Sequence, residues 1–200
     1  MSTQKRKYEL KARAESQRRT RERIVEATME LHEEVGPAKT TIAEIARRAG
    51  VQRLTVYNHF PDETRLFNAC GAHWRALNPL PDLSGAMALE DPRERVREAL
   101  EALYGWYRST EPMTENIQRD RLADPALDAV AAESVDAGQA QLAEALAAGF
   151  EGRGRRADAR RALTRVALDF WTWRRLDREG LDDAAAARLM ANSVACAGAR

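Results

Sequence analysis

Residues 41–60, TIAEIARRAGVQRLTVYNHF, decide the fold that we predict for this chain. Thr41 and Glu44 have the spacing of a capping box, in which the threonine oxygen accepts an orphan backbone N–H and the glutamate bonds back to the cap. Gly50, at the end of the helix that they open, allows a sharp turn. A second helix of two turns over about 52–59 follows. The stretch therefore predicts a helix-turn-helix.

The two helices divide their side chains into a packing set and an outward set. The residues predicted to lock the pair together are apolar: Ile42, Ile45, Ala46, Val51, Val56 and Phe60. The outward set on the second helix is Arg53, Leu54, Thr55, Tyr57, Asn58 and His59. Most of these side chains can bond base edges and phosphates in a major groove, which favours DNA binding. The alternative is that both helices are ordinary packing elements.

Charge is distributed unevenly along the 200 residues, although the formal net charge is only +1. Residues 1–65 carry 14 Lys and Arg against 10 Asp and Glu, whereas residues 66–200 carry 18 against 21. A cationic end on a mildly acidic body is the pattern expected when one end meets phosphates. Residues 1–16 are expected to form either a frayed arm or an extension of the first helix, and their basic side chains either contact a minor groove or phosphates or are simply solvated. These are Lys5, Arg6, Lys7, Lys11 and Arg13.

The rest of the chain is predicted to be helical, which makes the fold class all-α, because no two-residue alternation or Asn-Gly hairpin signal occurs. Asp91-Pro92 and Asp124-Pro125 each combine an N-cap residue with proline at the first helical position. We expect a loop over 78–91, helices after each Asp-Pro pair with the second bent near Gly138, and last helices at about 157–178 and 182–198.

Other classes of protein have little support in the sequence. Cys70 and Cys196 match no metal-ligand or redox spacing, so no metal site and no cofactor are expected. No apolar run approaches the roughly 18 residues that cross a membrane, and we expect a cytoplasmic protein. No nucleophile–base pattern points to an enzyme, and caps explain the nearest acidic residues, so no catalytic residue is expected. An enzyme and a polyanion-coating protein that uses only the basic arm are the rival hypotheses.

Residues 17–67 resemble the DNA-binding domain of the tetracycline-repressor (TetR) family. The matching segments are Arg23-Ile24-Val25-Glu26-Ala27, Glu34-Val35-Gly36, Thr41-Ile42-Ala43-Glu44-Ile45-Ala46, Ala49-Gly50-Val51 and Thr55-Val56-Tyr57-Asn58-His59-Phe60-Pro61. The match covers about a quarter of the chain. The remainder agrees with the family only in length, helicity and order of elements.

The resemblance implies a homodimer that lays residues 52–59 in the major groove of a near-palindromic operator. It implies phosphate contacts for Thr41 and Tyr57, and positions near base edges for Arg53, Leu54, Thr55, Asn58 and His59. Gln52 and Leu54 depart from the family, which often has a serine cap and a small residue there. Glu63 replaces a lysine that usually holds a phosphate, and Arg65 or the basic arm is a possible substitute.

The resemblance also implies a division of the chain and a ligand-controlled function. We expect a basic arm at 1–16, a three-helix DNA-binding domain at 17–65 and a helical ligand-binding and dimerisation domain at 66–200. The expected function is that of a repressor released from double-stranded operator DNA by an unidentified small-molecule effector.

Two sets of residues are predicted to carry the functions of the second domain. An aromatic-rich belt either lines a ligand pocket or forms plain core: Tyr104, Trp106, Tyr107, Met113, Asn116, Ile117, Phe170, Trp171 and Trp173. The helix predicted at 157–178 is apolar on more than half its circumference, which implies a partner helix across a two-fold axis unless both faces pack within one subunit. The predicted dimer interface consists of Leu163, Val166, Phe170, Trp171, Leu189 and Val194.

Overall fold

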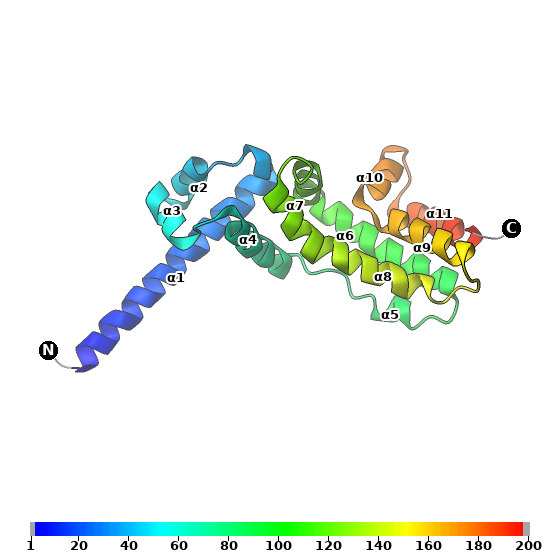
Figure 1. Ribbon diagram of the computed structural model, residues 1–200, viewed down its shortest axis with the longest axis horizontal. Coiled ribbons are helices and arrows are strands. Elements are labelled where there is room, and N and C mark those ends of the chain that lie inside the picture. Colours follow the sequence, from blue (N-terminus) through cyan, green and yellow to red (C-terminus); the bar gives the residue numbers. More distant parts are fainter. Residues whose placement is uncertain (1–2, 198–200) are drawn as a thin grey trace. The chain divides into compact units, whose positions relative to one another are not determined.

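The chain folds as helices throughout the computed structural model, which describes residues 3–197, with side chains from residue 7 onward (Figure 1). No β-strand occurs within this range, so the predicted all-α class is confirmed. No helix among the described residues is long and apolar enough to span a membrane. The chain divides into two compact units: Met1–Asn78 with Arg119–Val130, and Pro79–Gln118 with Ala131–Arg200.

The first unit contains the predicted helix-turn-helix. Its elements are α1 (Thr3–Glu34), the 3-10 turn η1 (Pro37–Lys39), α2 (Ile42–Ala49), α3 (Arg53–His59), α4 (Glu63–Leu77), the last two residues of α6 (Pro92–Asp120) and most of α7 (Pro125–Ala131). Its core gathers side chains from α1 to α4: Ile24, Val25, Ala27, Leu31, Ile45, Ala46, Ala49, Val56, Phe60 and Leu66. Buried area of this kind stabilises the unit, because removing apolar surface from water is favourable.

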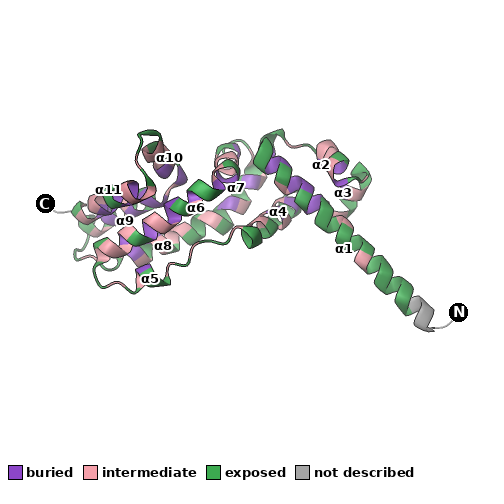
Figure 2. Ribbon diagram, turned by 180° about the vertical axis from the view of Figure 1, so that it is seen from behind, coloured by how far each residue is buried: buried purple, intermediate pink, exposed green. Residues whose placement is uncertain are grey.

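The first helix is longer than its docked part. The sequence allowed either a frayed arm or a helical extension for residues 1–16. Residues 3–16 are helical and form the first turns of α1. Ile24, Thr28 and Leu31 face the core, whereas Val35 is exposed because α1 ends at Glu34. Figure 2 shows that the helix is almost entirely exposed from residue 7 to its docked part.

The second unit contains α5 (Ser84–Met87), α6 (Pro92–Asp120) up to Gln118, the π-helical turn η2 (Ala132–Asp136), α8 (Ala137–Ala147), α9 (Arg155–Leu168), α10 (Phe170–Arg178) and α11 (Asp183–Cys196). The predicted loop over 78–91 thus contains one short helix. The bend predicted near Gly138 takes the form of the π turn just before it, where the backbone changes its hydrogen-bond spacing.

The prediction of one continuous helix over 157–178 is wrong. The chain breaks at Asp169, whose backbone is extended and whose carboxylate accepts hydrogen bonds from the N–H groups of Trp171 and Thr172. Aspartate is a strong N-cap residue, so it starts a new helix, α10, rather than continuing α9.

Two buried tyrosines donate hydrogen bonds to carbonyl groups at the end of α9, where the chain breaks. The last carbonyls of a helix have no partner within it. Tyr104 Oη donates to the carbonyl of Ala167 at 2.7 Å, and Tyr107 Oη donates to that of Leu168, also at 2.7 Å. Hydroxyls from α6 therefore complete the end of α9, and the rings of both tyrosines belong to the core of the unit.

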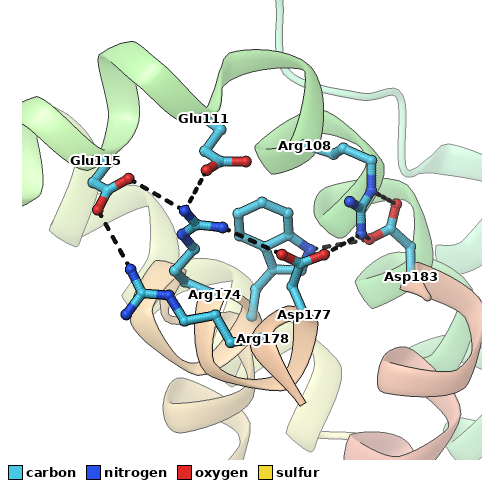
Figure 3. A network of polar contacts seen from close by, with 8 residues as sticks. Arg108, Glu111, Glu115, Arg174, Asp177, Arg178 and Asp183 are labelled. Atoms are coloured by element: carbon cyan, nitrogen blue, oxygen red, sulfur yellow. Dashed lines mark hydrogen bonds and ion pairs between the residues drawn. The ribbon is translucent and has the colours of Figure 1, made fainter. Parts of the chain in front are cut away.

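A charged network attaches α10 to α6 and α11 (Figure 3). Arg174 of α10 lies 2.7 Å from Glu111 of α6. Arg108 of α6 lies 2.9 Å from Asp177 and 2.9 Å from Asp183, and the indole N–H of Trp173 donates to Asp183 at 3.0 Å. Burial raises the pKa of Asp183, but the hydrogen bonds from Arg108 and Trp173 and the charge of Arg108 together outweigh burial and hold this pKa below its ordinary value.

Candidate nucleic-acid interface

The helix α3 turns one side chain fully inward and most of the others outward. Val56 is 0% exposed, whereas Leu54 is 66% and Tyr57 is 52% exposed. Arg53 and Asn58 are also exposed, and Thr55 and His59 are partly exposed. The outward set predicted from the sequence therefore lies together on the surface of one short helix, and donors of this kind can reach base edges and phosphates.

The turn before α3 is fixed by local backbone geometry. Gly50 has φ +64°, a left-handed conformation that a side chain disfavours, and the N–H of Val51 donates to the carbonyl of Ala46 at 2.9 Å. Thr41 Oγ1 accepts from the N–H of Glu44 at 3.2 Å, so the predicted cap forms. The reciprocal bond does not, because the carboxylate of Glu44 pairs with Arg47 instead.

Two contacts tie the helix-turn-helix to α1. Arg48 forms a two-pronged hydrogen bond with Glu34, at 2.6 Å and 2.7 Å, which lowers the pKa of that carboxyl from its ordinary value. The guanidinium of Arg21 lies 4.8 Å from the ring centroid of Phe60, at the end of α3. Planar guanidinium groups suit both kinds of contact. Together they hold α2 and α3 against one face of α1.

The residues that depart from the family pattern also have defined surroundings. The side chain of Gln52 makes no capping bond at the start of α3. Asp62 caps α4 by accepting from the N–H of Arg65 at 2.8 Å, and its carboxylate lies 3.2 Å from the guanidinium of Arg65. Both groups are largely exposed, and such pairs contribute little to stability, so a phosphate could compete with Asp62 for Arg65. Glu63 is exposed beside them.

The basic arm is present as the first turns of α1. Lys7, Lys11 and Arg13 are exposed, while the side chains of Lys5 and Arg6 lie outside the part that the structure describes. Arg19 pairs with Glu15 at 3.0 Å, and Arg18 with Glu22 at 3.2 Å.

A buried polar pair lies beneath this surface, within the first unit. Cys70 Sγ is 3.7 Å from Nδ1 of His32. Burial lowers the pKa of His32 to about 4, against the opposing charge of Asp120, and burial raises the pKa of the Cys70 thiol to about 12. Both groups are uncharged at neutral pH, so the thiol is not activated. Within the described residues, no group of three or more His, Cys, Asp or Glu side chains is placed to hold a metal ion.

Comparison with known proteins assigns this interface to a family. The family of bacterial regulatory proteins named tetR matches residues 24–70, the segment that contains α2, α3 and the docked part of α1. The chain therefore resembles this family over about a quarter of its length.

Two curated relatives share this TetR-family segment. The Probable acrEF/envCD operon repressor of Escherichia coli strain K12 is 34% identical over 83 residues, which are 41% of this chain and 38% of that protein. The HTH-type transcriptional regulator BetI of Yersinia pestis is 35% identical over 83 residues, 40% of this chain and 42% of BetI. The match therefore spans less than half of either relative.

Solved structures share the fold over nearly the whole chain. A TetR-like transcriptional regulator from Rhodococcus sp. RHA1 has a TM-score of 0.62 at 21% identity, covering 90% of this chain and 95% of that one. The multidrug binding protein EbrR, complexed with imidazole, has a TM-score of 0.55 at 23% identity, covering 88% and 92%. The predicted all-α fold, with an N-terminal helix-turn-helix followed by further helices, is thereby confirmed.

The aromatic belt predicted in the second unit divides into packed and partly exposed members. Tyr104, Tyr107, Phe170 and Trp173 are at most 3% exposed and contact one another as core, and Met113 is also buried. The partly exposed or exposed members are Trp106, Asn116, Ile117 and Trp171. A ligand that reached the packed members would have to displace their contacts.

The predicted interface residues divide in a similar way. Phe170 and Val194 are buried within their own unit, and Leu163 is half-buried. Val166 is 49%, Trp171 38% and Leu189 45% exposed. These three lie on α9, α10 and α11, so this chain leaves apolar side chains of all three helices open to solvent.

Proposed function

We propose that this chain is a sequence-specific DNA-binding regulator of the TetR type that represses the transcription of its target genes. The observation that carries the proposal is the division of α3, which commits Val56 to the core and leaves Arg53, Tyr57 and Asn58 free to enter a major groove. Tyr57 and Thr41 would contact phosphates. Arg53, Leu54, Thr55, Asn58 and His59 would lie near base edges, with arginine and asparagine suited to guanine and adenine.

The proposed regulator acts as a homodimer on a near-palindromic operator. Exposed apolar side chains on three neighbouring helices favour burial against a second copy, and a two-fold axis presents the same patch on both subunits. Val166, Trp171 and Leu189 would make the contact, while Leu163, Phe170 and Val194 would support it from within each subunit.

We further propose that a small-molecule effector releases the regulator from its operator. EbrR is a multidrug binding protein, and the regulator RolR, with a TM-score of 0.53 at 18% identity over 91% of this chain and 88% of its own, was solved with resorcinol. The belt from Tyr104 to Trp173 is the proposed effector site. Because four of its aromatic residues are packed, effector binding would rearrange the core of the second unit, and a stabilising ligand would raise its melting temperature.

The main alternative, a polyanion-coating protein, uses charge alone and has no need of the outward set on α3. Selection of binding sequences from a random DNA pool by the full chain separates the two. A regulator enriches one near-palindromic sequence, whereas a coating protein enriches none.

Arg53→Ala tests whether α3 recognises the selected operator. The side chain is exposed, so its loss leaves the core intact. We expect weaker operator binding and unchanged binding to a scrambled duplex. A good bidentate contact to a base contributes about 1–3 kcal/mol of discrimination. An equal loss on both duplexes would contradict the assignment of α3 as the reading helix.

A further inference from the structure

The basic arm is a rigid continuation of α1. The helix runs without a break from Thr3 to Glu34, and its last turns are packed against α2 and α4. Starting a helix is the costly step, and the packed turns supply that start, so each further residue adds to an existing helix. Ion pairs one turn apart, Arg18 with Glu22 and Arg19 with Glu15, support it further.

One face of this helix carries a basic stripe, which we define as Lys7, Lys11, Arg18 and Arg21. Their spacings of four, seven and three residues bring them to the same side of an α-helix. The stripe begins beside the reading helix, because Arg21 contacts Phe60 at the end of α3. From there to Lys7 it extends about 21 Å at 1.5 Å per residue.

The outer part of the stripe is available to an anion. No carboxylate lies within ion-pair distance of Lys7 or Lys11 among the side chains that the structure describes. Arg18 has only exposed partners, whose attraction is weak and easily replaced.

The helical form of the arm excludes one mode of DNA contact. An α-helix with side chains is about 10–12 Å across, whereas the minor groove of B-DNA is about 6 Å wide. Extended basic tails enter that groove, but this helix cannot do so while it stays folded. Phosphates along the outside of the duplex remain within its reach.

We propose that the basic stripe binds phosphates of the DNA that flanks the base pairs read by α3. The inference rests on the proposed function, and it adds that the contact requires a folded helix, is independent of sequence and lies outside the operator. The arm would thereby lengthen the bound segment of DNA and strengthen binding without changing the sequence that is preferred.

The test compares two duplexes carrying the operator selected by the full chain. The short one ends at the outermost specified base pairs, and the long one adds ten base pairs of arbitrary sequence on each side. We expect tighter binding to the long duplex and a salt dependence steeper by about 5, because each of the two arms of the proposed dimer would contact about three phosphates at about 0.9 per contact. Equal affinity and equal salt dependence for the two duplexes would overturn the inference.

Lys11 and Arg13 provide a matched pair of variants. Both side chains are exposed, and the two residues lie about 200° apart around the helix, so only Lys11 is on the stripe. Lys11→Gln should reduce the difference in salt dependence by about 1.8, which is about 0.9 for each arm of the proposed dimer, while Arg13→Gln should leave it unchanged. Equal effects of the two variants would show that net charge alone attracts the DNA, and would overturn the proposal that the basic stripe binds phosphates.

Ala12→Pro tests the need for a helix, because it keeps every charge and removes one backbone N–H from the helix. We expect the advantage of the long duplex to be lost. If the variant keeps that advantage, an extended tail makes the contact and the inference is overturned. If the full chain enriches no sequence at all, the proposed function fails first, which distinguishes the two failures.

Discussion

The two units of this chain are built from different side chains and depend on different kinds of interaction. The first buries aliphatic residues under short helices whose ends are fixed by neighbours in sequence, such as Thr41 and Gly50. The second buries tyrosine, phenylalanine and tryptophan, and its helix break is completed by hydroxyls more than 60 residues away in sequence. The contrast teaches that local signals form the surface proposed to meet DNA, whereas long-range contacts form the helical body.

The largest expected effect lies in the aromatic core. Trp173 is 1% exposed and contacts Tyr107 and Phe170. Trp173→Ala should lower the free energy of unfolding by about 3–5 kcal/mol, because it leaves a large cavity. Urea denaturation followed by circular dichroism measures the loss. Trp171→Ala is the control, since that side chain is 38% exposed, and an equal loss in both variants would contradict the packing described.

A pH-dependent effect of comparable size is expected in the first unit. The pKa of His32 falls from 6.5 to about 4 on folding, so the unfolded chain binds more protons between these values. Stability is therefore complete above pH 6.5 and declines as the pH falls to 4, by about 3 kcal/mol at about 1.4 kcal/mol per pKa unit. Denaturation at a series of pH values measures this decline. His32→Gln should remove this contribution, and an unchanged pH profile in that variant would contradict it.

A smaller loss is expected from the tyrosine hydroxyls. Tyr104→Phe leaves the carbonyl of Ala167 without this donor in a buried site, which should cost about 1–3 kcal/mol. Tyr107→Phe should cost less, because Gln139 Nε2 already lies 3.4 Å from the carbonyl of Leu168. Thermal unfolding of the two variants checks the order, and the reverse order would show that Gln139 does not compensate.

The smallest effect is expected at the cap of α2. Thr41→Ala removes the acceptor for the N–H of Glu44 and should cost about 1 kcal/mol. Thr41→Ser retains an oxygen there and should be nearly neutral. Amide hydrogen exchange in α2 measures the local change. If both variants exchange alike, the cap bond does not contribute to the stability of α2.

How far the sequence predicted the fold depended on the range of the signals. The caps predicted at Thr41, Asp91 and Asp124 lie next to the backbone groups that they satisfy, and all three form. The break at Asp169 was missed because the apolar pattern continues across it, although an aspartate inside an apolar run was a signal that could have been used.

The candidate site shows the same limit. The outward positions of Arg53, Tyr57 and Asn58 follow from helical periodicity around the buried Val56. The helical form of the arm did not follow from the sequence, because its charged residues suit either a solvated tail or a helix continued from a packed one. The packing of Tyr104 against the end of α9 could not be predicted either, since it requires knowing which carbonyls the break at Asp169 frees.

The reading helix gives the molecule a particular freedom to evolve. Val56 is the only buried residue among the seven of α3. The exposed positions 53, 54, 57 and 58 therefore contribute little to the stability of the fold. Substitutions at exposed positions typically change stability by less than about 0.5 kcal/mol. A lineage could therefore alter these four residues, and with them the sequence that α3 is proposed to read, while inheriting the same helical body.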